Sequence, residues 1–305
     1  MAAVETTLMY ICFVTLILSF PGNIFILVVN IIDFFRNRKL PLSDQLIFGF
    51  SAFSLLHGLH EGYAMYNDLY DLIIGIHNDL YDLNINIHTF MYLNLNILWF
   101  STLLSMHFCL KIVNINHWFY ICLQKRFPKL FPWIVLAFLP GYFFLILYSA
   151  LNTKPECLLN STSKLIVLNE FVRCSWLLFI FLAVCFLCTF LCSVSASTIL
   201  ISLCKHMERI QENIQGSRSP NIEAHVRAVK TVTMLLAANI LLFASVSVLA
   251  LCFDAWVYLF GILNFACYIF ASYFLIKGTK KLDMTLAEIL KAPSKFLHGI
   301  NCRYQ

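Results

Sequence analysis

The residues best placed for chemistry are His57, His60 and Glu61, near the end of one long apolar stretch. In a helix, this spacing puts all three on one face. Imidazole and carboxylate groups are common zinc ligands, but a complete site needs a further ligand, and the sequence offers no clear companion. The competing interpretation is a helix end whose polar tips reach water or lipid headgroups. We expect no metal and no other cofactor.

Other catalytic patterns are missing from the sequence. It has no G-x-S-x-G, H-E-x-x-H or P-loop motif. The long apolar stretches are nearly free of ionisable residues, which an enzyme working inside a membrane would need. Their polar groups are amides and hydroxyls, which hydrogen-bond between helices or anchor a ligand. We therefore expect a protein that is not an enzyme. The amides are Asn23, Asn30, Asn94, Asn96, Asn239 and Asn264.

The composition identifies the elements that carry these residues as membrane helices. Of 305 residues, 60% are hydrophobic and only 12% are charged, with a mean hydropathy of +0.79. The apolar residues fall into stretches of roughly 20, the length of a helix that crosses a bilayer. We predict an all-α seven-transmembrane bundle over residues 1–282, followed by a cytoplasmic tail at 283–305. The predicted spans are 8–32, 45–64, 88–112, 131–151, 175–203, 228–251 and 256–276.

Basic residues give the orientation of the bundle. Cytoplasmic loops are enriched in Lys and Arg. Of the 21 basic residues, 18 lie in the loops and tail on one side if the N-terminus is extracellular. The other side has the excess of acidic residues. We therefore expect a multi-pass protein with its N-terminus outside the cell.

Three features fall on the predicted outer side. The hexapeptide Asn-Asp-Leu-Tyr-Asp-Leu occurs twice, from Asn67 and from Asn78, and is either a loop-lengthening duplication or a pair of acidic patches that attract cations. Asn160 begins an Asn-Ser-Thr glycosylation sequon. Cys157 and Cys174 flank the oxidising side and are candidates for a disulfide.

Short motifs at the span ends make the assignment narrower. They are Pro-Gly-Asn-Ile-Phe-Ile at 21–26, Arg-Lys-Leu-Pro-Leu-Ser-Asp-Gln at 38–45, Asn94 with Trp99, Thr102, Leu104 and Ser105 followed by Leu-Lys-Ile at 110–112 and Asn114, Ser-Leu-Cys-Lys-His at 202–206, His-Val-Arg-Ala-Val-Lys-Thr-Val at 225–232, and Phe-Leu-Ile-Lys-Gly-Thr-Lys-Lys-Leu at 274–282. In these residues the chain resembles the bitter taste receptors, the taste receptor type 2 family of G-protein-coupled receptors. It lacks the family's Arg in helix two and has Ala-Ser at 271–272 in place of His-Ser or His-Pro, which indicates a divergent member.

The resemblance implies a receptor at the plasma membrane. Its partners would be small bitter agonists, a heterotrimeric G protein of the gustducin or inhibitory type, and membrane lipids, with no nucleic acid. The agonist would lie near the outer surface, with Asn94 as a hydrogen-bonding partner and Phe90 and Trp99 as aromatic neighbours. A vomeronasal type 1 receptor is the alternative with the same fold, and a small transporter is the alternative of another class. The residues expected to face the G protein are Lys205, His206, Arg227 and Lys230.

Overall fold

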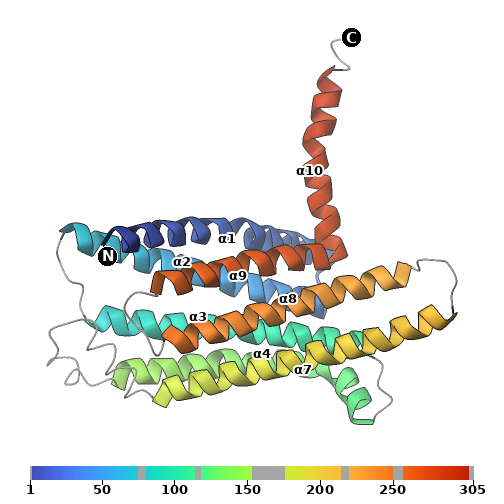
Figure 1. Cartoon of the computed structure of the whole chain (residues 1–305), viewed down its shortest axis with the longest axis horizontal. Helices are drawn as coiled ribbons and strands as arrows, with labels where there is room; N and C mark the ends of the chain where they lie inside the picture. Colours follow the sequence, from blue (N-terminus) through green and yellow to red (C-terminus); the bar gives the residue numbers. More distant parts are fainter. Residues whose placement is uncertain are drawn as a thin grey trace.

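The computed structural model describes residues 2–74, 80–113, 118–152, 176–213, 220–249 and 257–301. Every regular element in these ranges is an α-helix, so the all-α class is confirmed for them. Figure 1 shows most of the helices lying side by side along one direction. The helices are α1 (Ala2–Asn37), α2 (Leu42–Ile74), α3 (Leu80–Ile112), α4 (Trp118–Asn152), α7 (Trp176–Asn213), α8 (Pro220–Leu249), α9 (Val257–Gly278) and α10 (Lys280–Asn301).

The long helices form a closed ring of neighbours. α1 packs against α2 and α9, α2 against α3, α3 against α7, α7 against α8, and α8 against α9. α3 also contacts α8 across the ring, and α4 packs on α3. α10 turns sharply away from the axis of the bundle after α9 (Figure 1). The inner surfaces of the ring helices therefore meet in one core.

Four of the described helices contain a segment long and apolar enough to cross a membrane, at 6–37, 88–112, 179–202 and 258–278. α8 adds a shorter apolar stretch at 229–241. Large apolar side chains also cover the outside of the bundle, and Phe35 and Phe179 are 69% and 71% exposed. Such helices suit a lipid environment, because a helix that is apolar all round is not stable against water. The chain is a multi-pass membrane protein of helices.

Close packing inside the ring depends on small residues. Gly22 of α1 lies so near α9 that an added Cβ would sit 2.5 Å from Oγ of Ser272. Gly49 of α2 leaves no room for a Cβ beside the ring of Phe100 in α3. Glycine here allows the helix backbones to approach, as small residues do at interfaces within membranes.

The connection between α1 and α2 is short and well defined. Arg38 ends α1 in the left-handed region, with φ of 58°, and its N–H donates to the carbonyl of Phe34 over 2.8 Å. The carbonyl of Pro41 then accepts from the N–H groups of Asp44 and Gln45 and starts α2. These bonds satisfy backbone groups that a helix end leaves free.

The acidic repeat divides between two helices. Its first copy, starting at Asn67, lies in the last turns of α2, and the second copy runs into the start of α3 at Leu80. Residues 75–79 lie outside the described residues. In the described part, both copies therefore extend helices beyond the apolar spans that the sequence predicted.

Candidate functional site

A buried polar network joins three helices in one half of the bundle. Nδ2 of Asn94 in α3 lies 2.8 Å from Nε2 of His57 in α2. The hydroxyl of Tyr268 in α9 donates to Oδ1 of Asn94 over 3.1 Å. All three side chains are almost completely buried. The network thus ties α2, α3 and α9 together through one amide.

The hydrogen bonds of Asn94 also fix the roles of its partners. Its Nδ2 donates a second bond to the carbonyl of Phe90, over 3.1 Å. With Nδ2 as the donor, Nε2 of His57 must accept, which places the imidazole proton on Nδ1. Nδ1 has no hydrogen-bond partner among the described residues. Asn94 therefore uses both of its N–H groups, whereas His57 keeps one unpaired donor.

Aromatic rings surround His57 and hold it against the network. The centroids of Phe90, Tyr268 and Phe265 lie 5.3, 5.5 and 6.1 Å from the imidazole. Tilted and edge-to-face arrangements at these distances are favourable for aromatic pairs. The half of the bundle around Asn94 is thus an aromatic environment with few polar groups.

The other two predicted ligand residues lie on different sides of α3. Phe90 is half-buried beside His57. Trp99 stacks on Phe138 of α4, with centroids 4.1 Å apart and planes 8° apart, and its Nε1 has no partner among the described residues. Asn94 and Trp99 differ by five positions, which is roughly 140° around a helix. The structure therefore brings Phe90 to Asn94 and directs Trp99 toward α4.

The sequence cluster at the end of α2 is divided in the structure. His57 faces the core, whereas His60 lies beside Glu61, with 3.5 Å between Nδ1 and Oε1. Neither ring nitrogen of His60 has a hydrogen-bond partner among the described residues. No group of three His, Cys, Asp or Glu side chains is arranged for a metal in the part of the chain that the structure describes.

The residues predicted to face a G protein lie on two neighbouring helices. Lys205, near the end of α7, and Lys230, in α8, are both exposed. His206 and Arg227 belong to the same helices, but their side chains lie outside the described residues, as do Asn160 and the pair Cys157 and Cys174.

A second polar cluster, at the opposite end of α1 and α2, was missed by the sequence reasoning. Nζ of Lys281 in α10 lies 2.8 Å from Oδ2 of Asp33, 3.0 Å from Oδ2 of Asp44 and 3.2 Å from Oδ1 of Asn30. Burial alone would lower the pKa of Lys281, but the two carboxylates outweigh it and raise the pKa. We call these four residues the Lys281 clamp. The signal available in the sequence was a basic residue after the last span and acidic residues beside the first inner loop.

Comparison with known proteins identifies the family. The profile of the family described as Taste receptor protein (TAS2R) matches residues 1–294. The chain belongs to the TAS2R family. It is 29% identical to taste receptor type 2 member 4 of Gorilla gorilla gorilla over 226 residues, which cover 71% of this chain and 73% of the relative. It is 30% identical to human taste receptor type 2 member 2 over 223 residues, covering 69% and 70%.

The match to TAS2R proteins extends to both ends of the chain. Mouse taste receptor type 2 member 105 is 24% identical over 300 residues, which cover 95% of this chain and 98% of the relative. The resemblance stated from the short motifs is therefore confirmed. The buried network and the Lys281 clamp both lie within the matched TAS2R region.

Proposed function

We propose that the chain is a bitter taste receptor that binds small, mostly apolar or aromatic compounds from outside the cell and activates a heterotrimeric G protein. Membership of the TAS2R family is the observation that carries this proposal. The aromatic rings and scarce polar groups around His57 and Asn94 support the ligand class. A few ring contacts and one hydrogen bond give modest affinity, so we expect broad tuning at micromolar concentrations.

The proposed ligand contacts are Asn94, Phe90 and Trp99. Asn94 lies six residues beyond His88, where the apolar segment of α3 begins, so it lies about 9 Å along the helix from that end. A ligand at this depth, reached from the outer side, meets Phe90 first. Trp99 lies a further turn inward and has a free indole N–H to donate.

Ligand contact at Asn94 supplies a route to signalling. Both N–H groups of Asn94 are already used, and Oδ1 already accepts from Tyr268. A ligand that takes an N–H of Asn94 must therefore displace His57 or the carbonyl of Phe90. Such an exchange changes the contact between α2 and α3, and ligands act by favouring one arrangement of the helices over another.

The proposed readout lies at the other end of α7 and α8. Cys109, Val113, Ala196, Ile199 and Val232 form a small buried cluster that joins α3, α7 and α8 there. Small side chains and a limited contact area suit a joint that opens. The G protein, of the gustducin or inhibitory type, would meet the proposed basic rim of Lys205, His206, Arg227 and Lys230.

The proposed topology has seven spans, an extracellular N-terminus and residence in the plasma membrane. The biased distribution of Lys and Arg supports the orientation. If the bundle axis follows the membrane normal, α10 lies along the cytoplasmic surface (Figure 1). The vomeronasal alternative keeps this topology with another ligand class, and the transporter alternative needs no G protein.

Calcium release in cells that express the chain with a chimeric G protein tests the proposal. A panel of bitter compounds is applied to cells with and without that G protein. We expect at least one compound to give a concentration-dependent signal only when the G protein is present. Uptake or current that does not depend on the G protein would contradict the proposal and favour a transporter.

A further inference from the structure

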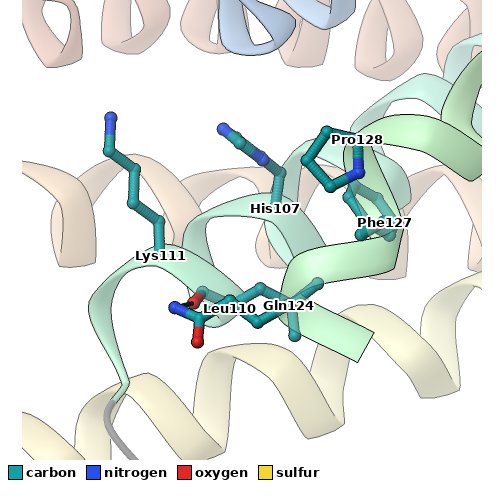
Figure 2. Close-up of a pocket in the computed structure, with 6 residues that line it drawn as sticks. All are labelled: His107, Leu110, Lys111, Gln124, Phe127 and Pro128. Atoms are coloured by element: carbon teal, nitrogen blue, oxygen red, sulfur yellow. Dashed lines mark hydrogen bonds between the residues drawn. The ribbon is translucent and has the colours of Figure 1, made fainter. Parts of the chain in front are cut away.

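A cavity of about 160 Å³ lies between the ends of α3 and α4 that are proposed to face the cytosol. It is distinct from the Asn94 network, which lies several turns away along α3. Figure 2 shows its lining side chains. They are His107, Leu110, Lys111, Gln124, Phe127 and Pro128.

The cavity has an apolar wall and a cationic rim. Phe127 and Pro128 of α4 form the apolar wall, and the His107 ring lies nearly parallel to the Phe127 ring at 6.3 Å. Lys111 follows His107 by one helical turn on α3, and Figure 2 shows both side chains projecting in the same direction. Lys111 is exposed and forms no ion pair with a described residue. A positive charge thus stands at the mouth of the cavity without an acidic partner in the described chain.

The walls are held in place by bonds between the two helices. Nε2 of Gln124 donates to the carbonyl of Leu110 over 2.8 Å, and the hydroxyl of Tyr120 donates to the carbonyl of Cys109 over 2.8 Å. These bonds use carbonyls in the last turn of α3, which have no partner within the helix. The cavity is therefore a formed feature of the joint between α3 and α4.

The residues beside the cavity place it at the level of lipid headgroups. Lys125, Arg126 and Lys129 of α4 are exposed next to it. Trp133, one turn further along α4, is 69% exposed, and Trp is enriched at the boundary between lipid and water. Together with Lys111 these residues form a basic surface on the side proposed to be cytoplasmic, so the inference rests on the proposed topology. The cytoplasmic leaflet carries the anionic lipids.

We propose that this cavity binds the phosphorylated headgroup of an anionic phospholipid from the inner leaflet. Nζ of Lys111 pairs with a phosphate oxygen at the rim. The apolar part of the headgroup or glycerol region rests on Phe127 and Pro128, and Lys125, Arg126 and Lys129 attract the lipid to the site. Basic pockets between membrane helices on the cytoplasmic side bind such headgroups.

Binding to the purified full-length chain in phosphatidylcholine nanodiscs tests this inference. The probe is a fluorescent phosphatidylinositol phosphate incorporated into the disc, and its proximity to the chain is followed by energy transfer. Lys111→Gln is compared with Lys129→Gln, which removes an exposed charge nearby that does not line the cavity. Because one pocket charge is removed, we expect Lys111→Gln to weaken binding about fivefold to tenfold and Lys129→Gln by no more than about twofold.

Two further arms make the result decisive. Lys111→Arg keeps the charge and should retain binding, which excludes misfolding as the cause of the loss. Soluble inositol phosphate and inorganic phosphate should compete weakly. Equal losses for Lys111→Gln and Lys129→Gln would overturn the proposal in favour of a diffuse basic surface, and strong competition by either soluble anion would overturn it in favour of a soluble ligand. Neither agonist nor G protein is present, so the outcome is independent of signalling by the receptor.

Discussion

The hydroxyl of Tyr268 donates to Oδ1 of Asn94 over 3.1 Å and so connects α9 to α3 inside the bundle. The same Asn94 amide contacts His57 of α2. Three helices that are separated in the sequence therefore share one amide. Any group that competes for this amide changes the contacts of all three helices.

Tyr268→Phe should lower the thermal stability of the purified receptor. The change removes the hydroxyl but keeps the buried ring, and a net hydrogen bond of this kind contributes about 1 kcal/mol. Tyr273→Phe is the matched control, because Tyr273 is 53% exposed. The measurement is the unfolding midpoint in detergent. Equal midpoints for the two variants would show that the bond from Tyr268 to Asn94 contributes nothing.

Asn94→Ala should reduce agonist potency in the calcium assay about tenfold or more, because a hydrogen bond worth about 1.4 kcal/mol corresponds to tenfold in affinity. Asn96→Ala is the control. Asn96 is also buried, and its Nδ2 donates to the carbonyl of Tyr92. Surface expression is measured alongside, so that a loss of protein is not read as a loss of binding. An unchanged response of Asn94→Ala to several agonists would contradict the proposed contact.

Gly22→Ala should destabilise the packing of α1 on α9. Its Cβ would lie 2.5 Å from Oγ of Ser272 and 3.0 Å from Cβ of Ser272, and overpacking of this kind costs about 1–3 kcal/mol. Adding Ser272→Ala removes the nearer atom and should restore part of the stability. The unfolding midpoints of both single variants and the double variant measure this coupling. Purely additive effects would show that the two residues do not meet.

Lys281→Met should destabilise the receptor by about 1–3 kcal/mol, because it leaves the buried carboxylate of Asp44 without its charged partner. Lys277→Met is the control, since the Lys277 side chain is 48% exposed in its pair with Asp283 and exposed pairs contribute little. Thermal unfolding of the two variants measures the difference. A loss for Lys277→Met as large as that for Lys281→Met would argue against the Lys281 clamp.

The Lys281 clamp should be insensitive to pH in the physiological range. Its carboxylates raise the pKa of Lys281 above the ordinary value of 10.5. A lysine with a raised pKa contributes its full stability below the pKa of the unfolded chain and loses it only as the pH rises through the folded value. The stability difference between wild type and Lys281→Met should therefore stay constant between about pH 6 and pH 9. A difference that falls across this range would contradict the assignment.

The sequence predicted the helical class because long apolar stretches leave few alternatives in a membrane. It also predicted Asn94 as a polar residue in an aromatic environment. It did not predict that His57 and Tyr268 would occupy the hydrogen bonds of Asn94. Those contacts join positions 37 and 174 residues apart, and the period of a single helix does not indicate which faces of different helices meet.

The Lys281 clamp was missed for a related reason. Lys281 lies in a run of basic residues that the positive-inside rule explains without any partner. Asp33 and Asp44 lie more than 230 residues away in the sequence. The turn between α9 and α10 brings them together, and nothing in the local sequence pattern indicates that turn.

The central claim is that the chain crosses the membrane seven times with its N-terminus outside the cell. Separate epitope tags at the two ends, stained in intact and in permeabilised cells, test it most directly. We predict that the N-terminal tag is stained in intact cells and the C-terminal tag only after permeabilisation. Staining of both tags under the same condition would place both ends in one compartment and contradict the account.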